Sequence, residues 1–177
     1  PERLPPEYTL RTFQKGDEAP FYNLMALAGW TDWNADRLAP WLPRIPGDGW
    51  FMVTHIPTNL IVATAMALAS EAYEHGGEIG WVAAHPDHKG HGLGKAVCSA
   101  VTRKLIEEGY RTIHLYTEHW RLPALHIYLS LGFIPYITST ASQELWQEVC
   151  SQLSIPYAKQ IWQDQIAENP PILIVYE

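Results

Sequence analysis

The amino-acid sequence predicts a single α/β (α+β) domain with a mixed, mostly antiparallel central sheet of about six or seven strands. The length of 177 residues is usual for one domain, and 47% hydrophobic against 18% charged residues is enough for a buried core. In the first half, short strand-like runs follow one another, which is typical of an antiparallel meander. In the second half, strand and helix patterns alternate, which is typical of parallel crossovers.

The first half is predicted to hold one strand, then two helices, then three strands. Residues 8–13 alternate in hydropathy and indicate the first strand. Asp17 can cap a helix whose apolar residues recur at helical spacing until Gly29. A second, short helix is expected over residues 34–42. The three strands are expected over residues 49–56, 60–70 and 78–85, with turns at residues 57–59 and at Gly76-Gly77.

The second half is predicted to begin with a long amphipathic helix. Apolar residues recur every four residues from Leu93 to Leu105, and Gly109 ends the pattern. The elements that follow are a strand over residues 112–118, a helix over 122–131 and a strand over 133–137. Because a helix connects them, the strands over 78–85 and 112–118 are expected to be parallel.

Residues 138–177 carry weaker signals. Apolar spacing from Leu145 to Leu153 indicates a helix, residues 156–167 a second helix, and residues 171–176 a final strand. This C-terminal extension is expected either to close over a pocket or to form the surface of a homodimer, and both alternatives stay open.

Composition argues against several classes of protein. The formal net charge of −7, from 12 basic and 19 acidic side chains, disfavours a nucleic-acid binder. The two cysteines, Cys98 and Cys150, are too few for a disulfide framework. The longest apolar run, over residues 60–69, is far shorter than the roughly 20 residues that span a bilayer. The N-terminus lacks the apolar segment of a signal peptide. We therefore expect a cytoplasmic protein with reduced thiols that binds neither nucleic acid nor membrane.

The strongest chemical signal is the glycine turn, residues 85–95, which reads His-Pro-Asp-His-Lys-Gly-His-Gly-Leu-Gly-Lys. Alternating glycines between a strand and a helix allow backbone N–H groups to form a nest for a phosphate. A Walker A loop would need glycine at Lys89 and Ser or Thr at Ala96, and a Rossmann fingerprint would need its third glycine one residue later. The turn therefore indicates either another kind of phosphate site or a tight turn without a ligand.

Three histidines of the glycine turn need a separate interpretation. His85, His88 and His91 are spaced by three residues, as metal ligands on a helix are. However, Pro86 and the glycines place them in a loop, and no cysteine supports a site. We therefore expect no metal here.

The glycine turn resembles the pyrophosphate motif of the GNAT superfamily of acyl-CoA-dependent N-acyltransferases. The family motif is Gln/Arg-x-x-Gly-x-Gly/Ala, and here it is occupied by Lys89-Gly90-His91-Gly92-Leu93-Gly94, with Lys in place of Gln or Arg. A second family run, Asn-x-x-Ala-x-x-x-Tyr-x-x-x-Gly-Phe, is matched downstream at Ala124, Tyr128, Gly132 and Phe133, while Arg121 replaces Asn. The resemblance is specific over residues 78–136 and topological over residues 1–77.

The resemblance implies that the fourth and fifth strands are parallel and splayed, with helices on both faces of the sheet. It divides the single domain, residues 1–177, into an N-terminal half that covers the acceptor site (1–77), an acetyl-CoA-binding core (78–137) and a C-terminal extension (138–177). Acetyl-CoA is the implied co-substrate, and no metal is implied. The residues implied to bind acetyl-CoA are Val82, Ala83, Ala84, Lys89, Gly90, His91, Gly92, Leu93, Gly94, Lys95, Arg121 and Tyr128.

The implied reaction is transfer of acetyl to a primary amine of a small molecule, by direct attack in a ternary complex. Tyr128 matches the family position of the acid that protonates the departing thiolate. Glu118 is the first candidate for the base because it ends the fifth strand, and Glu78 is the second. Aromatic and acidic residues near the first two helices suit an amine, namely Trp30, Trp33, Trp41, Trp50, Tyr22, Asp32, Asp36 and Asp48. Two other hypotheses stay open, a non-catalytic acyl-CoA-binding or sensing module and a structural domain with an empty turn.

Overall fold

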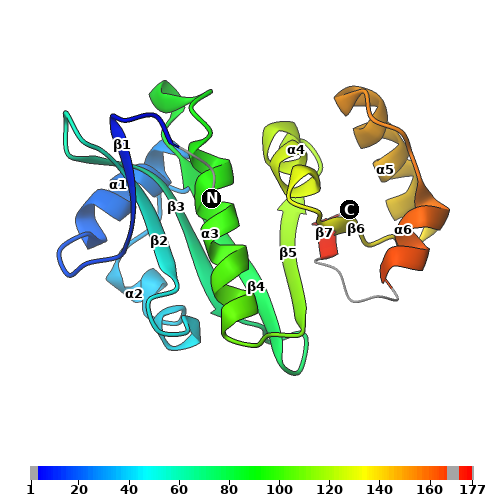
Figure 1. Ribbon diagram of the computed structural model, residues 1–177, viewed down its shortest axis with the longest axis horizontal. Helices are drawn as coiled ribbons and strands as arrows, with labels where there is room; N and C mark the ends of the chain where they lie inside the picture. The colour runs from blue at the N-terminus through cyan, green and yellow to red at the C-terminus, as the bar shows by residue number, and fades with distance from the viewer. Residues whose placement is uncertain (1–3, 167–171, 177) are drawn as a thin grey trace. The chain divides into compact units, whose positions relative to one another are not determined.

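The computed structural model describes residues 4–166 and 172–176. The chain divides into two compact units, Pro1–Tyr110 and Arg111–Glu177, and each is described by itself. Both units contain strands and helices (Figure 1). The predicted α/β class is confirmed, and all seven predicted strands have a counterpart in the described part of the chain.

The first unit is built on four antiparallel strands in the order β1-β2-β3-β4. Their bounds are β1 (Tyr8–Thr12), β2 (Trp50–His55), β3 (Leu60–Ala69) and β4 (Gly76–Ala84). Between β1 and β2 lie α1 (Glu18–Leu27), α2 (Ala35–Leu38) and the short 3-10 helix η1 (Leu42–Arg44). After β4 come the 3-10 helix η2 (Pro86–His88) and the long helix α3 (Leu93–Glu107).

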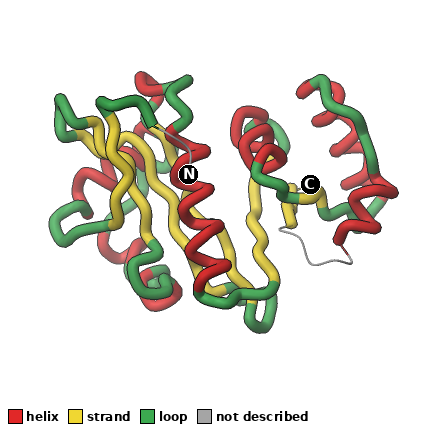
Figure 2. The backbone as a smooth tube through the Cα atoms, in the orientation of Figure 1, coloured by secondary structure: helices red, strands yellow, loops and turns green. Residues whose placement is uncertain are grey.

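Helices cover both faces of this sheet. Both α3 and α1 contact β3 and β4, and α3 lies in front of the strands in Figures 1 and 2, with α1 and α2 on the other side. As a result, β3 is buried at every position from Ile61 to Leu68. The α1 side holds a core cluster that includes Phe21, Leu24 and Met25, and each such side chain contributes roughly 1.5–3 kcal/mol by burial. The predicted spacing on α3 is confirmed, because Leu93 and Leu105 are both buried.

The start of β4 differs from the prediction. Gly76 and Gly77 belong to the strand, and the predicted turn at these glycines is wrong, because Gly77 pairs with Ala69. A Cβ on Gly77 would lie 2.7 Å from Cδ2 of Leu105 on α3. Glycine is therefore needed here for the close approach of a helix and not for a turn. The turn itself comprises Glu74 and His75, and His75 has φ +54°.

A β-bulge interrupts β4. Gly80 pairs with Met66 and Ala83 pairs with Thr64, so that two residues of β4, Trp81 and Val82, oppose one residue of β3. Trp81 has φ +51°, which is a rare, strained conformation for a bulky residue. The bulge lies in the stretch that the sequence comparison with the GNAT motif implied for acetyl-CoA.

The described residues of the second unit, 111–166 and 172–176, form three parallel strands and three helices. Its elements are β5 (Thr112–Glu118), α4 (Leu122–Ser130), β6 (Ile134–Pro135), α5 (Thr140–Leu153), α6 (Lys159–Ile166) and β7 (Ile172–Tyr176). β7 pairs in parallel with both β5 and β6, so the strand order is β5-β7-β6. The last strand in sequence therefore lies in the middle.

Two further elements are shorter than predicted, and proline explains both. The helix expected over residues 34–42 is divided into α2 and η1, because Pro40 and Pro43 cannot continue an α-helix. The Asn34 side chain caps α2 by accepting a hydrogen bond from the N–H of Arg37 at 3.0 Å. The strand expected over 133–137 shrinks to β6, whose Pro135 has no N–H for a ladder.

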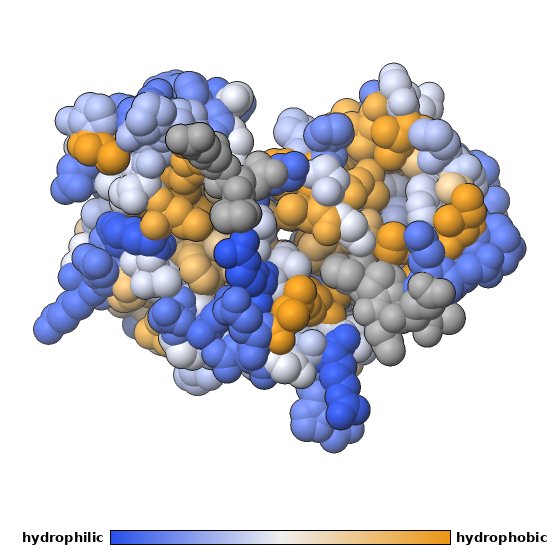
Figure 3. Space-filling view, in the orientation of Figure 1, coloured by the Kyte–Doolittle hydropathy of each residue, from blue (hydrophilic) through white to orange (hydrophobic). Residues whose placement is uncertain are grey.

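Large apolar side chains also reach the surface, as orange patches in Figure 3 illustrate for one face. The most exposed of them are Trp120, Ile161, Ile106, Ile56 and Leu27. Isolated apolar residues are ordinary on protein surfaces. No helix within residues 4–166 is long and apolar enough to cross a membrane.

Candidate functional site

The glycine turn holds two glycines in the left-handed region. Gly90 has φ +84° and Gly92, the N-cap of α3, has φ +73°. A Cβ on either residue would meet no atom within 4 Å. Glycine is therefore required by the backbone conformation and not by crowding. The open space lies next to the first N–H groups of α3, which have no partner within a helix. This is the arrangement that an anion-binding nest requires.

The side chains of the turn differ in role. Leu93 is 3% exposed and anchors the first turn of α3 in the core, so only its backbone is available to a ligand. Lys89 and His91 are exposed, and Lys95 is half-buried. The turn therefore presents basic side chains around a backbone cradle, as anion binding requires.

The predicted stretch of β4 lies directly before this turn. Ala83 is buried and pairs with Thr64, Ala84 is exposed and pairs with Ala63, and Val82 is half-buried in the bulge. The backbone of this stretch is thus offset from regular strand geometry.

Trp81 is the centre of an aromatic cluster in the first unit. The rings that meet it edge-on are those of Trp33, Trp41 and Trp30, with centroid distances of 4.6, 5.0 and 6.0 Å. Three of the predicted acceptor-side tryptophans therefore come together around a fourth that sequence reasoning missed. The strained φ of Trp81 places its ring there, and a strained backbone is often found at functional sites.

The chain's own cations cover several faces of this cluster. The Arg37 guanidinium carbon lies 5.4 Å from the ring centroid of Trp33 and 5.5 Å from that of Trp81. Arg37 also forms an ion pair with the exposed carboxylate of Asp32. Tryptophan rings and a carboxylate therefore lie close together here, and the guanidinium of Arg37 lies over two of the rings.

Glu78 is connected to the same cluster through Arg44. Arg44 Nη2 donates to Glu78 Oε2 at 2.8 Å, and Arg44 Nη1 donates to Glu71 at 3.2 Å. The Arg44 guanidinium lies 4.9 Å from the centroid of Trp41, which contacts Trp81. Burial raises the pKa of Glu78, although Arg44 lowers it in part. A carboxylate with a raised pKa that is linked through Arg44 to an aromatic cluster is a candidate general base.

The second unit holds the other predicted catalytic residues. Glu118 ends β5 and accepts a hydrogen bond from Arg121 Nε, and each of the two side chains is 33% exposed. Tyr128 lies on α4, is 5% exposed, and packs 6.2 Å from the ring of Phe133. The Nδ1 atom of His119, beside Glu118, is buried and has no hydrogen-bond partner within the described residues. The structure thus joins Glu118 to Arg121, and Tyr128 to Phe133.

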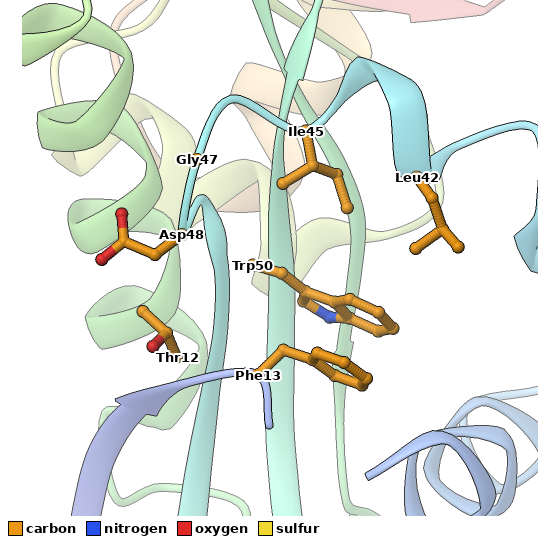
Figure 4. A pocket seen from close by; sticks show the side chains of 7 residues that line it. All are labelled: Thr12, Phe13, Leu42, Ile45, Gly47, Asp48 and Trp50. Carbon is orange, nitrogen blue, oxygen red and sulfur yellow. The ribbon is translucent and has the colours of Figure 1, made fainter. Parts of the chain in front are cut away.

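A shallow pocket of ≈ 170 Å³ lies elsewhere in the first unit, between the end of β1 and the start of β2 (Figure 4). Its lining residues are Thr12, Phe13, Leu42, Ile45, Gly47, Asp48 and Trp50. Trp50 stacks on Phe13 at 4.2 Å and donates to Thr64 at 2.9 Å. Asp48 pairs with Lys104 of α3 at 2.7 Å. Trp50 therefore belongs to the core, and Asp48 attaches its loop to α3.

Sequence reasoning missed Trp81, Arg44 and Tyr8. The bulge that orients Trp81 depends on a register shift between β3 and β4. No pattern of residues in the sequence predicts this shift. Arg44 reaches Glu78 across 34 positions, and Tyr8 reaches His88 across 80 positions. Such contacts follow from sheet register, which sequence patterns predict poorly.

No group of three or more His, Cys, Asp or Glu side chains within residues 4–166 and 172–176 is arranged to hold a metal ion.

Two kinds of sequence similarity connect this geometry to known proteins. The profile of the Acetyltransferase (GNAT) family matches residues 12–133. The mycothiol acetyltransferase of Actinosynnema mirum is 44% identical over 57 residues, which are 32% of this chain and 19% of that protein. The mycothiol acetyltransferase of Saccharomonospora viridis is 42% identical over 57 residues, with the same coverage. The matched stretch thus spans about a fifth of the length of these relatives.

Solved structures show the same fold. The ribosomal-protein-S18-alanine N-acetyltransferase of Escherichia coli has a TM-score of 0.57 and 20% identity, covering 76% of this chain and 86% of that one. The diaminobutyrate acetyltransferase of Paenibacillus lautus, in complex with L-2,4-diaminobutyric acid and coenzyme A, has a TM-score of 0.57 and 19% identity, covering 71% and 74%. Since the family profile covers most of the chain and includes both the glycine turn and Tyr128, the protein belongs to the GNAT acetyltransferase family.

Proposed function

We propose that this protein is an N-acetyltransferase that transfers the acetyl group of acetyl-CoA to a primary amine of a small molecule. The observation that carries the proposal is the glycine turn. Gly90 and Gly92 hold left-handed conformations beside open space at the start of α3, in a chain of the GNAT family.

The residues present fit the phosphates of coenzyme A. The backbone of Gly90, Gly92 and the first turn of α3 supplies N–H donors, and the exposed Lys89 adds positive charge. The lysine replaces a forked side chain of the family motif by a point charge, so that the backbone carries more of the recognition. Acetyl-CoA supplies the acetyl group as a thioester, which an amine can attack directly.

In the proposed reaction, side chains of this protein carry out two proton transfers. A base removes a proton from the acceptor ammonium, so that the nitrogen lone pair can form the C–N bond. Tyr128 donates its hydroxyl proton to the sulfur as the C–S bond breaks. Of the two candidate bases, Glu78 is the one whose pKa is raised by burial, which brings it closer to a working base near neutral pH. Both carboxylates are held in ion pairs, Glu78 with Arg44 and Glu118 with Arg121, so the raised pKa is what favours Glu78.

A small-molecule acceptor is supported by the names of two of the similar proteins, whereas the Escherichia coli enzyme is named for a protein alanine. The stretch of 44% identity is shared with an enzyme named for mycothiol, and the Paenibacillus lautus enzyme was solved with a small diamine acid. In this chain, the acceptor would meet the aromatic cluster around Trp81, where its ammonium would compete with Arg37 for the exposed carboxylate of Asp32.

The test is release of the CoA thiol from acetyl-CoA by the full chain across a panel of small amines. We expect Tyr128→Phe to lower kcat at least tenfold while the Kd for CoA stays unchanged, and Glu78→Gln to lower kcat more than Glu118→Gln. Tyr136→Phe and Glu144→Gln, both at exposed positions, are the matched controls.

Two results would contradict the proposal in different ways. Binding of CoA without turnover of any amine points to the non-catalytic acyl-CoA-binding module. No thermal stabilisation by CoA or acetyl-CoA at millimolar concentration leaves the glycine turn without a ligand.

A further inference from the structure

A cluster of histidines lies directly against the glycine turn. It consists of His55 at the end of β2, His85 and His88 around η2, and His91 between the two left-handed glycines. The rings of His55, His88 and His91 lie around Tyr8 of β1, and His85 contacts His88. We call these four histidines and Tyr8 the histidine cluster. Half of the eight histidines of the chain therefore meet at one place, although His55 and His91 are far apart in sequence.

His88 is the centre of the histidine cluster. Its ring centroid lies 4.8 Å from that of His55 and 5.1 Å from that of His85. Its Nδ1 atom and the hydroxyl of Tyr8 form a hydrogen bond of 3.0 Å. Tyr8 in turn lies 5.3 Å from the ring of His91. His88 is thus held between two strands and its own loop.

The other rings are fixed by their own Nδ1 atoms. Nδ1 of His55 bonds to Thr58 Oγ1 at 2.7 Å, and Nδ1 of His91 to the carbonyl oxygen of His88 at 3.2 Å. Nδ1 of His85 accepts from the N–H of Asp87 at 3.2 Å. These bonds orient the rings toward one another and make the cluster a fixed feature of the loop.

The electrostatic surroundings of His88 disfavour its protonated form. The ionisable groups that face it are Tyr8 from β1, His55 from β2, and His85, Asp87 and His91 from its own loop. Burial and the three other histidines lower the pKa of His88, and only Asp87 raises it. Several positive charges about 5 Å apart would repel one another, so His88 resists protonation while no anion is bound.

A bound polyphosphate would reverse this balance. His88 is two residues before Gly90, and His91 stands between Gly90 and Gly92, so the cluster belongs to the loop that cradles the phosphates in the proposed function. Negative charge next to an imidazole favours its protonated form. A group that gains affinity for a proton when a ligand binds must also raise the affinity for that ligand as the pH falls.

We propose that the histidine cluster makes binding of coenzyme A proton-linked, so that the protein takes up a proton at the cluster when the phosphates bind. The cluster then acts as a pH-dependent part of the cofactor site, and the affinity for CoA rises as the pH falls from 8 to 6. This inference rests on the proposed function, because it requires that the glycine turn binds CoA.

The test is calorimetric titration of the full chain with CoA at pH 6, 7 and 8, in two buffers of different ionisation enthalpy. The difference between buffers gives the number of protons taken up. His88→Asn keeps a side-chain amide that can bond to Tyr8 but removes the ionisable ring. The control is His75→Asn, because His75 is exposed, lies outside the cluster and has φ +54°, which asparagine tolerates.

The phosphate of CoA also takes up protons, and its contribution to the measured proton uptake is the same for each protein. The difference in proton uptake between variants therefore reports on the protein alone. We expect the wild type and His75→Asn to take up about 0.5 to 1 proton more than His88→Asn near pH 7. The ratio of Kd at pH 8 to Kd at pH 6 is expected to be about 3- to 10-fold larger for the wild type than for His88→Asn.

The outcomes separate the inference from the proposed function. Equal proton uptake in all three proteins, with CoA bound, overturns the role of the cluster and leaves the proposed function intact. Absence of CoA binding at every pH overturns both. If His88→Asn fails to fold by circular dichroism, His55→Asn is measured in the same way, because His55 faces His88 from β2.

Discussion

Asp17 occupies the predicted N-cap position of α1, but its side chain makes no capping hydrogen bond and instead forms a bidentate ion pair with Arg11 of β1. Arg11 Nη1 and Nη2 donate to the two carboxylate oxygens at 2.6 and 2.9 Å, and the N–H of Gln14 adds a third bond at 2.7 Å. The hydrogen bond from Arg11 is the main cause that lowers the pKa of Asp17. Because the side chains are only 26% and 14% exposed, the pair is screened less than an ordinary surface pair.

We predict that Asp17→Asn lowers the free energy of unfolding by about 1–2 kcal/mol at pH 7. A carboxyl whose pKa is lowered by folding contributes stability above its ordinary pKa of about 4, and this contribution is lost as the pH falls through the lower, folded value. The difference between wild type and Asp17→Asn should therefore shrink between pH 4 and pH 2. Urea unfolding at both ends of this range measures it. Asp36→Asn, at an exposed position, is expected to change stability by less than about 0.5 kcal/mol.

Cys98 offers a second prediction for a single residue. It is fully buried on α3, and burial raises the pKa of its thiol to about 12. The thiolate is the reactive form, so we predict that Cys98 does not react with an aromatic disulfide reagent in the native protein and reacts fully in urea. Labelling of Cys98 at pH 8 without denaturant would contradict this. The thiol assay for CoA release consequently gains no background from this residue.

At the scale of elements, the two ends of α3 provide a matched pair of glycines. Gly92 at its start and Gly109 after its end have φ +73° and +82°, and a Cβ on either meets nothing within 4 Å. Alanine at either position should therefore destabilise by about 1 kcal/mol, through backbone strain alone. Only Gly92 lies in the proposed cradle for the phosphates.

We therefore predict that Gly92→Ala raises the Kd for CoA at least tenfold, whereas Gly109→Ala leaves it unchanged at a similar cost in stability. Thermal unfolding gives the stability of each variant, and titration with CoA gives the Kd. Equal Kd values for both variants would show that the cradle does not bind the phosphates through the backbone at Gly92.

Elements with strong local signals are the ones that the sequence predicts best. The apolar repeat and the flanking glycines place α3 within two residues, and β5 is predicted without error as Thr112–Glu118. The errors in the predicted elements arise where tertiary packing determines the local structure. Gly76 and Gly77 read as a turn in the sequence, but Leu105 packs against Gly77 and makes the pair part of β4. The bulge at Trp81 comes from pairing with β3, which leaves no local pattern.

At the scale of the whole molecule, the topology contains one feature that sequence patterns do not reveal. The final strand over 171–176 is predicted as an element, but its position between β5 and β6 is not. Strands that are neighbours in sequence are usually neighbours in the sheet. This rule does not predict a last strand that lies between two earlier ones. The candidate site could likewise be predicted only in part. Its glycines and Tyr128 are identified from sequence motifs, whereas the contacts among Glu78, Arg44 and the tryptophans depend on tertiary packing.

The binding of CoA can be followed in each unit by itself. At a CoA concentration of 100 Kd, the expected gain in the free energy of unfolding is about 2.7 kcal/mol. We predict that CoA slows amide hydrogen exchange at the start of α3, where the proposed cradle lies, and that Gly92→Ala abolishes this effect. Tyr128 belongs to the other unit, so exchange in α4 is a separate test of its proposed role. Unchanged exchange in α4 on addition of CoA would remove Tyr128 from the proposed mechanism.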